Sequence, residues 1–218
     1  MSAQSEFEAE LQSELGRQSM ACDASVLEGL SAHFELMLKW GRKMNLTSIF
    51  NPKQAARLHA VDSLFFDQLL PSAERIIDAG SGAGFPGIVL ALRRPETELV
   101  LLEPLQKRCS FLRVVVSHLR LPNVRVVEGR LEPEGSTAPV GHFGAAVSRA
   151  TWAPLEWIGL GVQLLESGGH LVVSGGRGAH PPERVAEAGR RVGLGWLRRR
   201  SLRLGDADRV LDLLRLTA

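Results

Sequence analysis

The chain has 218 residues, 44% of them hydrophobic, and its 26 Lys and Arg nearly balance its 24 Asp and Glu. This length favours one sizeable core in one domain with an appendage, and the charge excludes a globally basic chain. Cys22 and Cys109 are too few for a disulfide framework or a zinc site. The first residues are acidic and polar, and no uncharged stretch approaches the roughly 20 residues of a membrane span. We therefore expect a cytoplasmic protein with no membrane association.

The amino-terminal third has helical periodicity. Ser25 and Glu28 form a capping box, and apolar residues recur at helical spacing from there to about Gly41. A second helix is expected after Asn51-Pro52, ending at Leu70-Pro71. We expect residues 1–71 to form a helical extension packed on the core formed by residues 72–218.

From residue 74 the pattern changes to short β-branched runs that alternate with helical segments. Five such runs are RIID, ELVLLE, VRVVEG, FGAAVS and HLVVS. This alternation predicts a parallel sheet with helices on both faces. The tail, WLRRRSLRL and RVLDLLRL around a GDAD turn, predicts a closing antiparallel pair. The expected fold is therefore α/β, a seven-stranded, doubly wound, Rossmann-like sheet.

The most informative segment is ERIIDAGSGAGFPG, which runs from a strand through a glycine turn into a helix. Glycines permit positive φ and let a ligand approach bare backbone, while a helix start offers unpaired N–H groups. The loop fits two cofactors. Gly82-x-Gly84-x-x-Gly87 spells the dinucleotide fingerprint, whereas Asp78-x-Gly80-x-Gly82-x-Gly84 spells an S-adenosylmethionine loop. Glu103, after the second strand, would hold ribose hydroxyls in either case.

The rest of the chain favours S-adenosylmethionine over a nicotinamide cofactor. Only 138 residues (218 minus 80) follow Gly80, which leaves little room for a separate substrate domain. The segment after the fourth strand, SRATWAP, has neither the Asp/Asn-Pro-Pro-aromatic tetrad of exocyclic amine methylation nor the cysteine of pyrimidine C5 methylation. A ring nitrogen such as guanine N7 carries an exposed lone pair and needs no base. A nicotinamide-dependent oxidoreductase and a non-catalytic nucleotide- or RNA-binding module remain the alternatives.

At about residues 36 to 178 the chain resembles the bacterial small-subunit ribosomal RNA guanine-N7 methyltransferases, also called glucose-inhibited division protein B. The resemblance rests on an ordered set of motifs: WGRKMNLTSI, LHAVDSL, IIDAGSGAGFPGI, LLEPLQKRCSFL, GRLE and VSRA. It implies a class I methyltransferase fold and a monomeric enzyme that transfers methyl from S-adenosylmethionine to N7 of one guanine of 16S ribosomal RNA in the small ribosomal subunit.

The resemblance also assigns roles to residues. Gly80 and Phe85 would line the methionine and ribose side of the cofactor, Glu103 would accept the ribose hydroxyls, and Leu131 with Glu132 would border the adenine. Arg149 would face both cofactor and base, as the catalytic residue, with no general base required. The expected cofactor-binding residues are Asp78, Gly80, Gly82, Gly84, Phe85, Glu103, Leu131, Glu132 and Arg149, and the expected RNA-binding residues are Lys43, Arg57, His59, Lys107 and Arg108.

Two positions depart from the family pattern. The arginine that usually precedes the motif histidine is replaced by Leu58, and the lysine that usually follows the fifth strand by Gly175. Arg57 stands one residue before the first position, and Arg177 stands two residues after the second. A shift of one residue rotates a helical side chain by about 100°, so equivalence of Arg57 with the missing arginine is not assumed.

Overall fold

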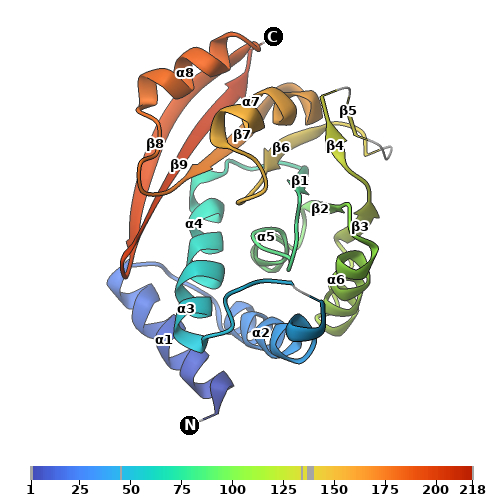
Figure 1. Cartoon of the computed structure of the whole chain (residues 1–218), viewed down its shortest axis with the longest axis vertical. Coiled ribbons are helices and arrows are strands. Elements are labelled where there is room, and N and C mark those ends of the chain that lie inside the picture. The colour runs from blue at the N-terminus through green and yellow to red at the C-terminus, as the bar shows by residue number, and fades with distance from the viewer. Residues whose placement is uncertain (1, 45, 134, 137–139, 218) are drawn as a thin grey trace.

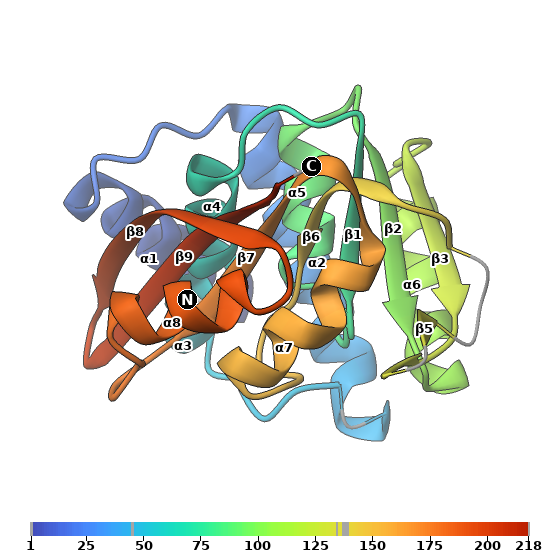
Figure 2. The same cartoon turned by 90° about the horizontal axis from the view of Figure 1, so that it is seen from above.

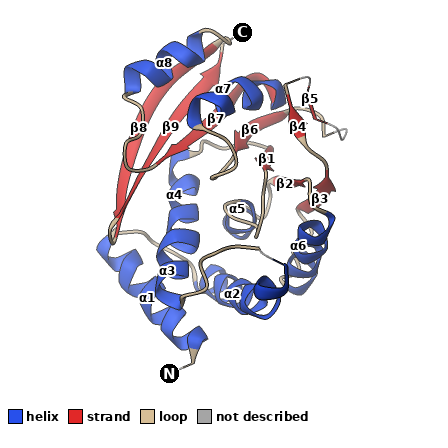
Figure 3. Ribbon diagram, in the orientation of Figure 1, coloured by secondary structure: helices blue, strands red, loops and turns tan. Residues whose placement is uncertain are grey.

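The structure, a computed structural model, describes residues 2–44, 46–133, 135–136 and 140–217, except for the side chains of residues 42, 43 and 135. A seven-stranded sheet crosses the molecule in the order β3-β2-β1-β6-β7-β9-β8 (Figure 1, Figure 3). Its strands are β1 (Arg75–Ala79), β2 (Glu98–Glu103), β3 (Val124–Glu128), β6 (Phe143–Val147), β7 (Leu165–Gly175), β8 (Leu194–Leu204) and β9 (Ala207–Leu216). A separate pair joins β4 (Leu131–Glu132) to β5 (Gly135–Ser136).

The first five strands of the sheet are parallel, and β9 runs antiparallel to both β7 and β8. The seven strands and the closing antiparallel pair are therefore as the sequence predicts. The order reverses at β1, because the chain steps from β1 outward to β3 and then returns to β6 on the other side of β1. Such a reversal opens a crevice at the carboxyl ends of the strands, where ligands bind in open α/β sheets.

Helices cover both faces of the sheet, which gives three layers (Figure 2). Apolar residues alternate along the strands between two clusters, so that Ile76 and Leu101 face one side and Ile77 and Leu102 the other. The first side is covered by α1 (Ala3–Arg17), α2 (Ala24–Met44), α4 (Asp62–Leu69), α5 (Gly87–Arg93) and α6 (Gln106–His118). The second is covered by α7 (Pro154–Gly161), a 3₁₀ turn (Val162–Leu164) and α8 (Pro182–Arg190). Among the described residues, no helix is both long enough and apolar enough to span a bilayer.

The helix expected after Asn51 is one continuous element with three parts. Asn51 caps α3 (Pro52–Ala55) by accepting from Gln54 N–H, a π-helical turn (Ala56–Val61) follows, and α4 completes the element. A π turn inserts an extra residue and changes the direction of the side chains around it. This turn carries Arg57 and His59. The short helix α8 and the β4–β5 pair were not anticipated from the sequence, and the domain boundary at residue 71 stays a prediction.

Candidate functional site: the crevice at the carboxyl ends of the strands

A cavity of about 580 Å³ lies where the sheet order reverses. Four segments of the sheet contribute to it: the glycine loop after β1, residues 149–152 after β6, the end of β7, and Arg209 of β9. Residues 46–49, which follow α2, the π turn with the start of α4, and Arg108 and Pro154 also line it. The amino-terminal helices therefore supply part of the same cavity as the glycine loop.

The glycine loop is held tightly on one side and open on the other. Gly80 N–H donates to the Leu102 carbonyl over 2.7 Å, and Gly80, Gly82 and Gly84 have φ of 73°, 57° and 94°. A Cβ at Gly80 would come within 2.4 Å of Thr151 Oγ1, whereas one at Gly82 would meet nothing closer than 3.9 Å. Space for a ligand against bare backbone therefore lies at Gly82. Gly84 is packed against Ile88 and His33 and does not line the cavity.

Asp78 lies beneath the loop and does not line the cavity. It is fully buried, and its Oδ2 accepts from Gly87 N–H over 2.9 Å at the start of α5. Its Oδ1 has no partner among the described residues. Burial raises the pKa of Asp78 to about 7, although the Gly87 N–H opposes that rise. The side chain thus holds the loop to the helix, and any effect on the cofactor is through that loop.

Glu103, at the end of β2, is buried at 1% exposure. Its Oε2 accepts from Gly82 N–H over 2.9 Å and its Oε1 from Leu105 N–H over 3.0 Å. Arg108 Nη1 also lies 3.9 Å from Oε1. Glu103 is therefore tied to the loop and does not line the cavity, so its contact with ribose hydroxyls stays a prediction.

Phe85 forms the centre of an aromatic stack. Its ring lies 4.5 Å from the His33 ring on one side and 4.6 Å from the His59 ring on the other. His33 Nε2–H donates to the Ala83 carbonyl over 2.8 Å, and burial lowers the pKa of His33 to about 4. The stack joins α2, the glycine loop and the π turn, and both histidines in it are neutral.

Arg149 joins β6 to the π turn. Its Nη1 donates to the Leu58 carbonyl over 2.6 Å and to Asp62 Oδ2 over 3.1 Å, and its Nη2 donates to His59 Nδ1 over 3.0 Å. The guanidinium also lies 5.5 Å from the Phe85 ring centre. His59 and Asp62, which share a helix face in the sequence pattern, are therefore linked through Arg149, with no recorded bond to each other.

The tautomer of His59 follows from its partners. Because arginine only donates, Nδ1 is an acceptor, and Nε2 carries the hydrogen that is donated to Thr47 Oγ1 over 3.1 Å. Burial, and then the positive charge of Arg149, hold the pKa of His59 well below its ordinary value. Its one lone pair is occupied, so His59 is poorly suited to remove a proton from a substrate.

The remaining sequence-predicted residues lie at various distances from the cavity. Arg108 lines it, and Lys107 is exposed on the first turn of α6. Leu131 and Glu132 line a second hollow of about 590 Å³, which shares Trp152 with the cavity. The Lys43 side chain lies outside the described residues. Arg177 is exposed on the surface and does not line the cavity.

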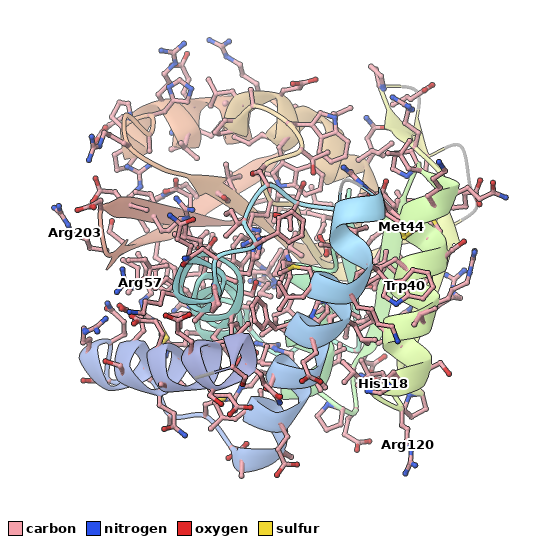
Figure 4. All side chains as sticks on the ribbon, turned by 60° about the horizontal axis from the view of Figure 1, so that its bottom comes forward. Trp40, Met44, Arg57, His118, Arg120 and Arg203 are labelled. Carbon is pink, nitrogen blue, oxygen red and sulfur yellow. The ribbon has the colours of Figure 1, made fainter. Side chains whose placement is uncertain are left out.

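Arg57 points away from the cavity. It pairs with Glu10 of α1, at 2.7 Å between Nη2 and Oε1, and lies 3.7 Å from Glu14. Figure 4 shows Arg57 on the side of the molecule where α1 lies, with Arg203 beyond it, whereas Trp40 lies on α2 beside α6. Within the π turn, Arg57 thus faces α1 whereas His59 lines the cavity. Arg57 does not take the place of the family's missing arginine in the cavity lining.

Sequence reasoning missed several cavity residues. Arg209 and Ser174 come from elements expected only as strands, and Thr151 was not singled out within SRATWAP. His33, which does not line the cavity but stacks on Phe85, was unremarkable as a lone histidine on a helix. The only available signal was for Thr151, which follows the VSRA motif by one residue.

Comparison with known proteins decides between the cofactor interpretations. The family model for rRNA small subunit methyltransferase G, GidB, matches residues 26–193. The chain belongs to this family. It is 38% identical over 190 residues to a Ribosomal RNA small subunit methyltransferase G from Anaeromyxobacter sp. (strain Fw109-5), covering 86% of each chain. It is 34% identical over 180 residues to the protein of the same name from Xanthomonas campestris pv. campestris (strain B100), covering 82% of each.

Solved structures confirm the expected class I methyltransferase fold. A SAM-dependent methyltransferase from Aquifex aeolicus superposes with a TM-score of 0.57 at 15% identity, covering 75% of this chain and 93% of that one. A methyltransferase from Pyrococcus furiosus gives a TM-score of 0.55 at 14% identity, covering 86% and 98%. Membership of the rRNA small subunit methyltransferase G family favours neither the nicotinamide-dependent oxidoreductase nor the non-catalytic module.

The residues present fit S-adenosylmethionine, the cofactor of this family of enzymes. Gly82 leaves room against the cavity-lining backbone, and the buried Glu103 holds that backbone in place. The backbone of the glycine loop is a polar part of the lining, and the stacked rings of Phe85 and His59 are an aromatic part. A nucleoside with a charged, partly apolar tail matches that order of groups.

Proposed function

We propose that this chain transfers the methyl group of S-adenosylmethionine to N7 of one specific guanine in 16S ribosomal RNA, within the small ribosomal subunit. We also propose that it acts as a cytoplasmic monomer. Family membership supports methyl transfer to ribosomal RNA, and the arrangement of the cavity supports the ring nitrogen as acceptor.

The observation that carries the choice of N7 is the way Arg149 occupies His59. Methylation of an amine or hydroxyl group requires a proton to leave, which a positioned base promotes. Here Nδ1 of His59 accepts from Arg149, and the hydroxyls of Ser148 and Thr151 donate to the carbonyls of Ala79 and Gly80. The carboxylate of Asp62 is ion-paired with both Arg149 and Arg209, which favours its charged form and makes it a weak base. Guanine N7 attacks through its own lone pair, so no proton is removed at that atom.

When bound, S-adenosylmethionine would supply an electrophilic methyl group on a sulfonium. The task of this chain is then to hold two reactants in line, which by itself supplies a large part of a rate enhancement. Gly82 and Glu103 would fix the nucleoside end, and Phe85 with its stacked histidines would form a rigid wall. Arg149, held by three acceptors, would keep that wall and the end of β6 in one position.

The experiment is methyl transfer from labelled S-adenosylmethionine to small subunits that lack the modification. The labelled RNA is then treated with strand-cleavage chemistry specific for N7-methylguanine. One cleavage site, in 16S RNA and dependent on the enzyme, is expected. Label that enters the RNA without creating a cleavage site would show a different acceptor atom, and no incorporation into any subunit preparation would reject the function.

A further inference from the structure

The cavity has two halves that different strands supply. The glycine loop, which follows β1, lines one half, on one side of the point where the sheet order reverses. Ser174, Gly175 and Arg209 come from β7 and β9 on the other side, where Gly175 pairs with Val210. If the cofactor occupies the first half, the second half is where the acceptor must lie.

Asp62 brings an unusual carboxylate to this second half. It lines the cavity and is only 1% exposed. Its Oδ2 accepts from both Arg149 Nη1, over 3.1 Å, and Arg209 Nε, over 3.2 Å. Its Oδ1 is buried and, within the described parts of the chain, has no hydrogen-bond partner. Leaving a buried acceptor without a donor costs stability. Asp78 has such an oxygen too, but Asp62 differs from it in lining the cavity, where a bound ligand can supply the donor.

Arg209 places donors beside that acceptor. Its Nη1 donates to the Asp208 carbonyl over 3.2 Å, while Nη2 has no recorded acceptor among the residues described. Its side chain is 25% exposed and lines the cavity. The second half of the cavity is therefore lined by Asp62, which has one buried and unpartnered carboxylate oxygen, and by a guanidinium that is only partly engaged.

We infer that Asp62 and Arg209 recognise the edge of the target guanine, with Arg209 donating to O6 and Asp62 Oδ1 accepting from N1–H. This inference rests on the proposed function and specifies how its site selects the base. Guanine carries an acceptor and a donor side by side at O6 and N1, whereas adenine carries a donor and an acceptor in the same places. Adenine would therefore be mismatched at both contacts, while N7 of guanine is left free to react.

A purely structural role makes a different prediction. If Asp62 only clamps α4 to β6 and β9, its loss would reduce stability and turnover without changing which base is preferred. Base preference is therefore the measurement that separates recognition from clamping.

The test measures binding of 5′-GMP, 5′-IMP, 1-methyl-GMP and 5′-AMP to the full chain saturated with S-adenosylhomocysteine. GMP and IMP should bind about equally, because both carry O6 and N1–H. AMP and 1-methyl-GMP should bind at least about tenfold more weakly, which corresponds to one or more lost hydrogen bonds. The 1-methyl-GMP comparison uses the unmodified protein, so it holds even if variants at Asp62 do not fold.

The matching variant is Asp62→Asn, which puts a donor in the place of the unpartnered oxygen. It should remove the preference for GMP over AMP. Asp212→Asn is the control, because Asp212 is also a buried aspartate that pairs with an arginine, Arg199. Asp212 lies on the face of β9 opposite to that of Arg209. That variant should keep the preference for GMP even if its stability falls.

Equal binding of GMP and AMP, no detectable binding of any nucleotide, or an unchanged GMP preference in Asp62→Asn would each overturn the inference. These outcomes are distinct from failure of the proposed function. A protein that methylates small subunits but shows no GMP preference refutes only the recognition by Asp62 and Arg209. A protein that neither binds S-adenosylhomocysteine nor methylates subunits refutes both.

Discussion

Nη2 of Arg149 lies 3.0 Å from Nδ1 of His59, although the two residues are 90 positions apart in the chain. This bond ties the end of β6 to the π turn of the amino-terminal helices. Because it uses the only lone pair of the imidazole, it fixes the tautomer of His59 and removes a potential base from the cavity. One contact thus joins the two parts of the fold and removes one candidate base from the site.

Replacing Arg149 should damage both stability and activity. Arg149→Gln leaves the Leu58 carbonyl without this donor and Asp62 paired with Arg209 alone in a largely buried site, and removing one partner of such a pair costs roughly 3 kcal/mol. We expect methyl transfer to small subunits to fall by at least about tenfold at a temperature where the variant is folded. Urea unfolding and initial rates measure the two effects.

Arg191→Gln is the control, since its ion pair with Glu187 is exposed and should contribute less than about 1 kcal/mol. Full activity in Arg149→Gln would remove the residue from the site.

Stability should depend on pH through two buried groups with opposite signs. The pKa of His33 is lowered to about 4, so its contribution is complete above pH 6.5 and is lost as the pH falls toward 4. The pKa of Asp78 is raised from 3.8 to about 7, so its contribution is complete below pH 3.8 and is lost as the pH rises through 7. The shifts correspond to about 3 and about 4 kcal/mol, so between pH 4 and 7 they largely cancel.

Variants should separate these two contributions. Relative to the unmodified protein, Asp78→Asn should gain stability with rising pH between 4 and 7, and His33→Gln should lose it. Urea midpoints at four pH values measure both differences. His118→Gln, at an exposed histidine of α6, should run parallel to the unmodified protein. Parallel curves for all three variants would show that neither buried group titrates as described.

The glycine loop should respond differently at Gly80 and Gly82. Both have positive φ, so alanine costs about 1 kcal/mol at either position. A Cβ at Gly80 also collides with Thr151, whereas one at Gly82 enters open space where the cofactor is expected. Gly82→Ala should therefore fold but bind S-adenosylhomocysteine at least about tenfold more weakly.

Gly80→Asp should abolish S-adenosylhomocysteine binding. Gly80→Ala should weaken it, and the second substitution Thr151→Ala should partly restore it. Calorimetry with S-adenosylhomocysteine checks all four proteins, and unchanged affinity in Gly82→Ala and Gly80→Asp would contradict the site.

Local patterns were sufficient to predict most of the sheet and the loop. The short β-branched runs predict the five parallel strands, because strands buried on both faces need such residues along their length. The tail pair β8 and β9 was predicted from two strand-like runs around a GDAD turn. The glycines predict the loop because only they adopt its φ angles without strain. Glu103 could be placed because it follows the second strand directly, so its position depends on a short stretch of chain.

Long-range placement could not be predicted in the same way. The π turn has no sequence signature, yet it decides that His59 faces the cavity and Arg57 faces α1. Arg209 reaches the cavity only because β9 inserts between β7 and β8, and a tail strand with several arginines gives no sign of which one will do so. Asp78 fits the loop motif, but the motif does not say that its side chain turns inward to Gly87.

Arg57 and Arg108 should therefore have separable effects, although both were expected to bind RNA. Arg57 pairs with Glu10 of α1, and Arg17 and Arg57 together hold the pKa of Glu10 below its ordinary value against the opposing effect of burial. Arg57→Ala should lower the stability of α1 docking by about 1 kcal/mol and leave methyl transfer unchanged.

Arg108 lines the cavity, 3.9 Å from Glu103, so Arg108→Ala should weaken S-adenosylhomocysteine or RNA binding with little change in the urea midpoint. Binding to small subunits over a range of salt concentrations tells these apart, because a residue that contacts phosphate reduces the salt dependence when it is removed. A reduced salt dependence in Arg57→Ala would show that this side of the molecule also contacts the RNA.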